Sequence, residues 1–234
     1  MKLSESRSLR KYALLLILAS FLLYFGGLGG YGLLEPDEGR YSEIPREMLE
    51  TGDFVTPRLN YVKYFEKPVL HYWLTAASLA VFGENEFAGR FWPAILALGS
   101  VLATWILARR LYGFPAAFFS SLILATSLLH FAIGRINIID MPLSFFLTAA
   151  IVGLWFGIDE TTEEETAKNR RYLLVFYAGM ALAVLSKGLI GIVLPGGILF
   201  WYILFTRRWS LVRRVLYIPG ILLFFALTVP WFLE

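Results

Sequence analysis

The chain has 234 residues, of which 58% are hydrophobic and 17% aromatic, and its mean hydropathy is +0.64. This composition is too apolar for an ordinary soluble domain, and the absence of cysteine excludes a disulfide framework and a thiolate metal site. The formal net charge of +3 does not point to nucleic acid, because the basic residues form short clusters between apolar runs, as the topology signals of membrane proteins do.

Seven apolar runs follow one another along the chain. A helix needs about 20 apolar residues to cross a bilayer core, and six runs reach or approach that length: residues 12–34, 91–107, 116–133, 141–158, 188–206 and 215–233. Another run, residues 172–185, is shorter but continuous with polar ends. The first run ends in "LLEPDE" without a small-residue cleavage site, so we interpret it as a retained anchor instead of a signal peptide. We predict an all-α membrane protein with about seven transmembrane helices.

The short run at residues 69–82 decides the topology. If it crosses the bilayer, the basic pair at 109–110 lies on the side opposite the basic N-terminus, and Asp140 lies opposite Asp37. If it lies on the surface, every basic cluster shares one side, as the positive-inside rule requires. The run is also too short to span comfortably. We therefore predict an interfacial helix here and a cytoplasmic N-terminus.

The polar residues of this run support that interpretation. His71, Thr75 and Ser78 are spaced by four and three, which gives a polar stripe on one helix face. In the resulting topology residues 35–82 form an outer loop with interfacial helices between the first two spans. The turn at 134–140 and residues 186–187 reach the same outer side, and "DETTEEETAKNRR" (159–171) becomes an inner connector.

Charged residues gather on that outer side, each near the end of an apolar run. They are Asp37, Glu38, Arg40, Glu66, Lys67, Arg135, Asp140 and Lys187. Charges at this depth are costly unless they are paired or hydrated, so they suggest function. Arginine and lysine here suit the phosphate of a lipid. An opposing carboxylate, such as Asp37 or Asp140, suits proton transfer from a hydroxyl or support of positive charge on a sugar ring.

Other motifs give weaker signals. His71 could bind a metal or shuttle a proton, and His130 lies in an apolar run where a packed polar residue is the simpler interpretation. "GGLGG" at 26–30 lacks the Lys-Ser/Thr of a phosphate loop and lies within a predicted span, where glycines serve close helix packing. Nothing demands a metal: the carboxylates could hold Mg²⁺, but no spaced set of ligands requires one.

Three stretches carry a resemblance to a known family. "EPDEGRYSEIPREMLETGDFVTPRLNYVKYFEKPVLHYWL" resembles the first outer loop of bacterial membrane glycosyltransferases with the C-type fold. "GRINIIDMPLSFF" and "LSKGLIGIVLP" resemble two further motifs of that group. The similar families are the lipid A aminoarabinose transferases and the wider protein O-mannosyltransferase superfamily. The resemblance runs from about residue 12 to the end and is most specific in the first loop.

The resemblance implies an inverting transfer from a polyprenyl phosphate-linked sugar on the outer side of a bacterial inner membrane. The family's acidic residues match Asp37, with Glu38 beside it, and Asp140. The family's phosphate-binding cations match Arg40 and Lys67. The predicted topology adds Arg135 and Lys187 as further candidates for binding the phosphate. Tyr41, Tyr64 and Glu66 lie within the same motifs. The acceptor is lipid A or, alternatively, a protein serine or threonine.

The chain is about half as long as is usual in that family, so we expect an N-terminal module without the family's C-terminal part. A fragment, half of a split enzyme with a C-terminal partner chain, and a non-catalytic membrane partner are all compatible with this length. A transporter or flippase is the remaining alternative. It predicts charges within the spans, and residues 91–107 and 141–158 carry none.

Overall fold

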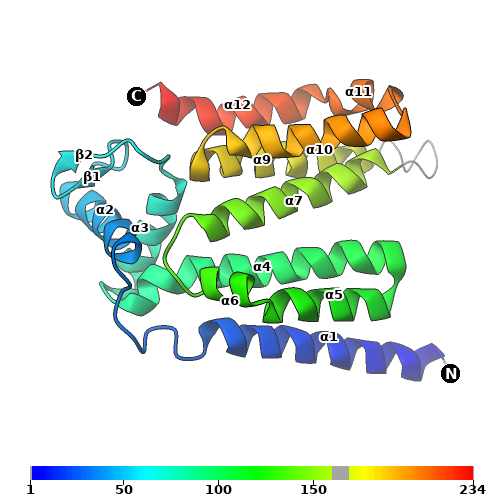
Figure 1. The fold of residues 1–234 in the computed structure, drawn as a ribbon, viewed down its shortest axis with the longest axis horizontal. Coiled ribbons are helices and arrows are strands. Elements are labelled where there is room, and N and C mark those ends of the chain that lie inside the picture. Colours follow the sequence, from blue (N-terminus) through cyan, green and yellow to red (C-terminus); the bar gives the residue numbers. More distant parts are fainter. Residues whose placement is uncertain (1, 160–168, 234) are drawn as a thin grey trace. The chain divides into compact units, whose positions relative to one another are not determined.

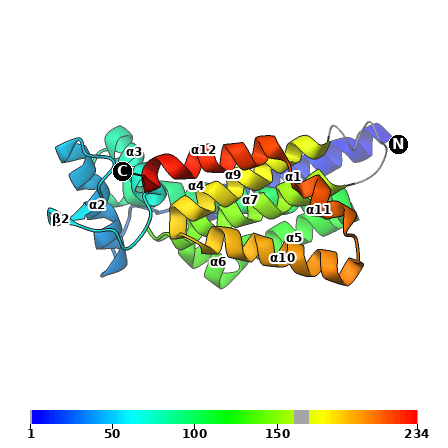
Figure 2. The same cartoon turned by 90° about the horizontal axis from the view of Figure 1, so that it is seen from above.

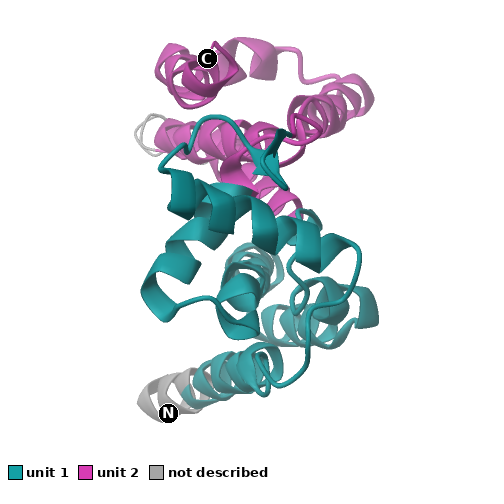
Figure 3. Cartoon of the chain, turned by 90° about the vertical axis from the view of Figure 1, so that its left-hand side faces the viewer, with its two compact units in different colours: residues 1–63, 72–141 teal, residues 64–71, 142–234 magenta. Residues whose placement is uncertain are grey.

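The computed structural model describes residues 2–159 and 169–233, and almost all of their regular structure is helical (Figure 1). Most of the predicted inner connector, residues 160–168, lies outside the described residues. The chain divides into two compact units, of which unit 1 holds residues 1–63 and 72–141 and unit 2 holds residues 64–71 and 142–234 (Figure 3).

Unit 1 is built on a group of long helices that run side by side (Figures 1 and 2). These are α1 (Lys2–Phe25), α4 (Glu86–Tyr112) and α5 (Phe114–Thr126), with the short α6 (Leu128–Ile133) after α5. Gly113, at φ 85°, ends α4, and the next helix has a proline in its first turn, so the chain reverses direction there.

Helix α1 ends earlier than the sequence predicted. We expected one span over residues 12–34, but the helix stops at Phe25 and "GGLGG" follows it as turns and irregular chain. Arg135 explains the position of this end, because its guanidinium donates to the carbonyl oxygens of Leu23 (2.7 Å), Tyr24 (3.1 Å) and Gly26 (2.8 Å). Carbonyls in the last turn of a helix lack partners within the helix, and a cation satisfies them.

Two other predicted spans are also interrupted. The run 116–133 divides at Ser127, whose extended backbone (ψ 125°) separates α5 from α6. Serine and threonine favour such breaks because their hydroxyls compete for backbone groups, and the hydroxyl of Thr126 donates to the carbonyl of Leu122 at 2.8 Å. The run 215–233 contains α12 (Ile218–Phe232), while Val215 ends the preceding α11 (Ser210–Val215).

Past the end of α1, unit 1 carries α2 (Asp37–Thr51), a hairpin of β1 (Arg58–Leu59) and β2 (Val62–Lys63), and α3 (Leu70–Phe82), most of which lies in this unit. The hairpin was not predicted. Its turn residues Asn60 and Tyr61 both have positive φ, 53° and 62°, as a type I′ turn requires. Glu47 of α2, which is 1% exposed, accepts the Tyr61 N–H at 3.0 Å and so ties the turn to the helix.

The polar residues of helix α3 lie on its buried face. His71, Thr75 and Ser78 are all buried, and the hydroxyl of Ser78 donates to the carbonyl of Ala88 at 2.7 Å. The exposed face carries Val81 instead, which is 74% exposed. The polar stripe that the spacing indicated is therefore the packing face of this helix.

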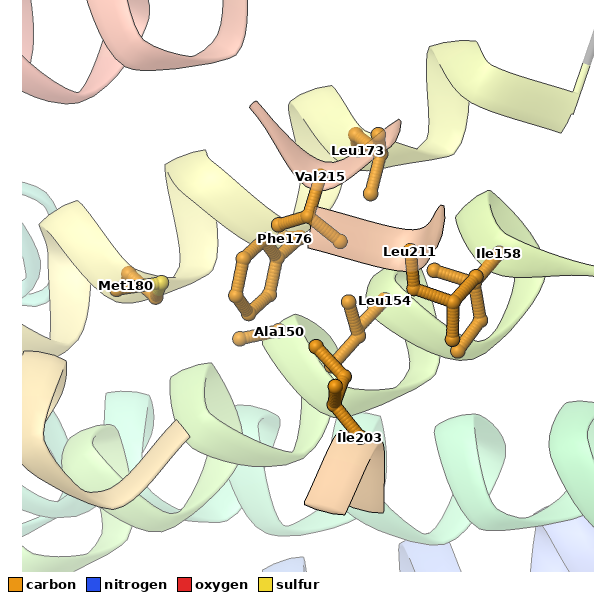
Figure 4. Close-up of a cluster of buried hydrophobic side chains, with 9 residues drawn as sticks. All are labelled: Ala150, Leu154, Ile158, Leu173, Phe176, Met180, Ile203, Leu211 and Val215. Carbon is orange, nitrogen blue, oxygen red and sulfur yellow. The ribbon is translucent and has the colours of Figure 1, made fainter. Parts of the chain in front are cut away.

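Unit 2 has an apolar core. It contains α7 (Asp140–Ile158), η1 (Arg170–Tyr172), α9 (Leu173–Lys187), α10 (Ile190–Thr206), α11 and α12, although the first residues of α7 belong to unit 1. Figure 4 shows the buried cluster, to which α7, α9, α10 and α11 contribute Ala150, Leu154, Ile158, Leu173, Phe176, Met180, Ile203, Leu211 and Val215. Helices α7 and α9 approach closely at Gly179, where an added Cβ would lie 2.9 Å from the Cβ of Ala150.

Each of the seven predicted runs contains a helix, but within residues 2–159 and 169–233 only α4 and α7 are long and apolar enough to cross a bilayer by length and composition. Helices α3, α5, α10 and α12 are apolar but shorter. The number of spans stays a prediction.

Candidate active site

A buried ion pair lies at the end of unit 1 that carries α2 and α3. Arg90 of α4 and Glu38 of α2 form a bidentate pair, with Nε to Oε1 at 2.8 Å and Nη2 to Oε2 at 2.7 Å, and both side chains are 0% exposed. The same guanidinium donates to the carbonyls of Leu28 (3.0 Å), Tyr31 (2.8 Å) and Gly32 (2.8 Å). One side chain thus joins α4, α2 and the segment that leads from α1 to α2.

The carboxylate of Glu38 has no accepting position left. Besides the two bonds from Arg90, its Oε1 accepts the N–H of Asn137 at 2.8 Å and its Oε2 accepts the N–H of Leu34 at 2.8 Å. An ionised carboxylate offers about four lone-pair positions. Burial raises the pKa of the Glu38 carboxyl, but the hydrogen bonds from Arg90, Asn137 and Leu34 and the charge of Arg90 outweigh it and hold the pKa below its usual value.

Asp37, by contrast, presents its carboxylate to solvent. It is the first residue of α2, and its side chain is 55% exposed. Arg40, one turn further along, places Nη1 3.7 Å from Oδ1 of Asp37. The predicted acid and the predicted phosphate-binding cation of the first motif therefore lie side by side, on a helix that Glu38 fixes to the rest of unit 1.

The other predicted residues of unit 1 have different surroundings. Tyr41 is 5% exposed, and its ring centroid lies 6.1 Å from that of the buried Tyr72, so it packs within the unit. Arg135 binds the end of α1, and its own carbonyl accepts the hydroxyl of Tyr31 at 3.0 Å. Asp140 is half-buried and begins α7.

The remaining predicted residues belong to unit 2. The hydroxyl of Tyr64 donates to Oε2 of Glu66, and the Lys67 ammonium lies 3.6 Å from Oε1 of the same carboxylate. Glu66 is 57% exposed at its side chain and Lys67 29%. Lys187 is the last residue of α9. The structure thus brings together Asp37 with Arg40 in one unit, and Tyr64, Glu66 and Lys67 in the other.

Sequence reasoning missed two residues of this region, Arg90 and Asn137. Arg90 directly precedes the apolar run at 91–107, and an arginine at such an edge is costly unless it is paired, which was the signal available. Asn137 lies inside "GRINIID", a motif from which only Arg135 and Asp140 were singled out.

The histidines show no metal arrangement. Within the described parts of the chain, no three His, Asp or Glu side chains group as metal ligands. His71 is buried in α3. His130 places Nδ1 2.8 Å from the hydroxyl of Tyr24, which also donates to the carbonyl of Ala125 at 3.1 Å. This agrees with the interpretation of His130 as a packed polar residue.

Residues 10–234 match the family described as dolichyl-phosphate-mannose-protein mannosyltransferase. The chain belongs to this family. A relative from Pseudomonas fluorescens, named undecaprenyl phosphate-alpha-4-amino-4-deoxy-L-arabinose arabinosyl transferase 2, is 34% identical and aligns with 99% of this chain and 39% of its own length. An uncharacterized protein of Aquifex aeolicus is also 34% identical, over 95% of this chain and 43% of its own.

Two crystal structures share the fold of this chain. ArnT from Cupriavidus metallidurans, solved in the apo state and bound to undecaprenyl phosphate, superposes with a TM-score of 0.89 at 35% and 36% identity. The match covers 95% of this chain and 41% of ArnT. The chain therefore spans about two fifths of the length of these relatives. Its membrane nature and its mainly helical fold agree with that relationship.

Proposed function

We propose that this chain takes part in glycosyl transfer from an undecaprenyl phosphate-linked sugar to lipid A at the outer face of a bacterial inner membrane. The observation that supports this most strongly is the similarity, over 95% of the chain, to an ArnT whose structure was solved with undecaprenyl phosphate bound. The proposed orientation has a cytoplasmic N-terminus and α2 on the outer side, in agreement with the distribution of basic residues.

In this proposal Asp37 acts on the acceptor. Its exposed carboxylate either accepts the proton of an acceptor hydroxyl or, where the acceptor is a lipid A phosphate that is already anionic, orients it. The acceptor oxygen forms a bond to the anomeric carbon from the face opposite the leaving group. The bond from that carbon to the phosphate oxygen breaks, and its electron pair leaves with the polyprenyl phosphate, so the configuration inverts.

The cations act on the leaving phosphate. Arg40 and Lys67 bind it through charge-assisted hydrogen bonds and stabilise the charge that it gains, with Lys187 as a further contributor. Asp140 assists through its charge or by ordering its loop. Glu38 has all its accepting positions occupied, so we assign it to holding α2 instead of exchanging protons. No step requires a metal.

The family name favours a second acceptor. Because the matching family is described as a protein mannosyltransferase, a serine or threonine hydroxyl is the alternative to lipid A, and such a hydroxyl needs Asp37 as a base. A C-terminal partner chain is a further part of this proposal and is tested together with transfer.

The test is transfer by the purified chain in liposomes. Radiolabelled undecaprenyl phosphate sugars are offered with lipid A and, separately, with a serine- and threonine-containing peptide. We expect product with one acceptor and at least a 100-fold loss in Asp37→Asn and Lys67→Ala, the size expected for loss of a catalytic group. Near-normal rates in Asp37→Asn would remove Asp37 from the mechanism.

Two controls separate the outcomes. Glu50→Gln neutralises another exposed carboxylate, near the opposite end of α2 from Asp37, and should keep the wild-type rate. If the folded chain gives no product, binding of undecaprenyl phosphate is measured directly, and the assay is repeated with the part of Cupriavidus ArnT that lies outside the match. Transfer restored by that part would support the split enzyme, whereas binding without transfer in both cases would indicate a non-catalytic module.

A further inference from the structure

Helix α2 contains a proline at a position that leaves one carbonyl without its usual donor. In an α-helix the carbonyl of residue i accepts the N–H of residue i+4. Pro45 lies four residues after Tyr41 and has no N–H, and its ring also pushes that carbonyl outward. Tyr41 is 5% exposed, so water does not replace the missing bond readily. A buried carbonyl that loses its donor lowers the stability of the fold.

Asn137 supplies the missing donor. Its Nδ2 donates to the carbonyl of Tyr41 at 3.2 Å and to Oγ of the neighbouring Ser42 at 3.0 Å. Its Oδ1 accepts the hydroxyl of Thr75 in α3 at 3.4 Å, and its backbone N–H donates to Glu38 at 2.8 Å. Asn137 is 0% exposed, so its bonds are made inside the protein.

A glycine of α4 leaves room for the amide of Asn137. At Gly89 of α4 an added Cβ would lie 3.3 Å from Oγ of Ser42 and 3.5 Å from Nδ2 of Asn137. A side chain at that position would crowd the bonds between the asparagine and α2. The arrangement therefore depends on three features: the proline in α2, the asparagine in the 134–140 turn, and the glycine opposite them.

We propose that Pro45 and Asn137 form a matched latch, in which the proline exposes a carbonyl and the asparagine amide binds it. The latch fixes α2, which carries Asp37 and Arg40 at its start, to the turn that ends at Asp140. Asn137 is thereby a positioning residue for transfer, a part of the inference that rests on the proposed function. The latch itself does not.

The inference predicts a specific rescue. In Asn137→Ala the carbonyl of Tyr41 loses the bond from the amide, while the backbone N–H of residue 137 still bonds Glu38, so α2 is held less firmly to the turn. In Pro45→Ala residue 45 has an N–H again, so this carbonyl regains an intrahelical partner. Removal of Asn137 should then cost less stability in the Pro45→Ala background than in the wild-type background, because the N–H of residue 45 bonds that carbonyl in place of the amide.

A double-mutant cycle on unfolding tests the latch without any activity. Urea unfolding of the detergent-solubilised chain is measured for wild type, Pro45→Ala, Asn137→Ala and the double variant. We expect Asn137→Ala to lower the midpoint clearly and Pro45→Ala to remove at least half of that loss. Ser100→Ala, which deletes another buried hydroxyl of unit 1 that donates to the carbonyl of Leu96, should show no coupling to Pro45→Ala. Additive losses for Pro45 and Asn137 would overturn the latch.

A spectroscopic measurement tests the positioning. The chain has no cysteine, so Thr51→Cys and Glu84→Cys can carry a single pair of spin labels at exposed positions of unit 1. We expect the distance distribution between α2 and the start of α4 to broaden in Asn137→Ala and to be unchanged in Ser100→Ala. An unchanged distribution in Asn137→Ala would contradict a positioning role.

Transfer kinetics complete the test. We expect Asn137→Ala to lower kcat by about tenfold or more and to raise the KM for the donor, because Asp37 and Arg40 both lose their fixed orientation when α2 is held less firmly. If wild type transfers and Asn137→Ala keeps its kcat, the positioning role is wrong. If wild type does not transfer, the proposed function fails, while the unfolding cycle still decides the latch.

Discussion

Unit 1 joins α2 and α3 to its long helices through buried polar groups, whereas the core of unit 2 is apolar. In unit 1 the fully buried pair of Glu38 and Arg90 and the amide of Asn137 connect α2, α3, α4 and the 134–140 turn. In unit 2 the cluster around Phe176 connects α7, α9, α10 and α11. Hydrogen bonds require fixed directions and distances, whereas apolar packing tolerates rearrangement.

The difference shows what each region is suited to. A carboxylate whose accepting positions are all occupied fixes α2 in one place, and Asp37 beside it gains a defined position. The apolar cluster holds helices together without specifying the placement of any polar group. Asp37 and Arg40 therefore lie at the start of a helix that polar contacts hold in place. Removal of one of these contacts should lower the free energy of unfolding.

The largest effect is expected for Arg90→Ala. The substitution leaves the Glu38 carboxylate buried without its cation and removes the donor from the carbonyls of Leu28, Tyr31 and Gly32. Removal of one partner of a buried pair costs about 3–5 kcal/mol. The free energy of unfolding in detergent measures this.

Arg46→Ala is the matched control for that variant. Arg46 also pairs with a carboxylate on α2, Glu43 at 2.7 Å, but both side chains are about one third exposed (32% and 31%). We expect a loss of at most about 1 kcal/mol, because solvent screens such pairs. Equal losses in the two variants would mean that the buried pair has no special role.

The apolar cluster of unit 2 should be sensitive to lost volume but tolerant of a change in shape. Phe176→Ala leaves a cavity beside Ala150 and Met180 and should cost about 3–5 kcal/mol by the same measurement. Met180→Leu keeps the volume and should cost less than about 1.5 kcal/mol. A large loss from Met180→Leu would show that the apolar core is as specific as the polar junction, which would contradict the comparison.

The smallest effect is a dependence of stability on pH. Since the folded-state pKa of Glu38 lies below its unfolded value, this group contributes stability that is fully present above the unfolded pKa of about 4.3 and is lost as pH falls through the folded pKa. The unfolding free energy of wild type should therefore fall below about pH 4 more steeply than that of Glu38→Gln. Glu43 and Asp53, whose pKa values are also lowered by their hydrogen bonds, contribute equally to both curves. Identical slopes would contradict an ionised buried Glu38.

The sequence by itself determined the class of the protein and the location of its helices. Apolar composition and run length are local properties, so each of the seven runs was predicted to be helical and contains a helix. The first motif also singled out Asp37 and Arg40, and the structure places them one turn apart in α2. The helix ends at Phe25 and Ser127 were not predictable from run length, since a distant arginine and local hydroxyls define them.

Only the tertiary structure decided which charged residues are exposed for chemistry and which are structural. Asp37 and Glu38 are adjacent in the chain, yet one is solvent-exposed and the other is fully buried. The partners that decide this are far apart in sequence: Arg90 lies 52 residues from Glu38 and Asn137 lies 99 residues from it. Local patterns report the chemistry of a side chain and the helix face on which it lies. Its hydrogen-bond partners depend on where the rest of the chain returns in space.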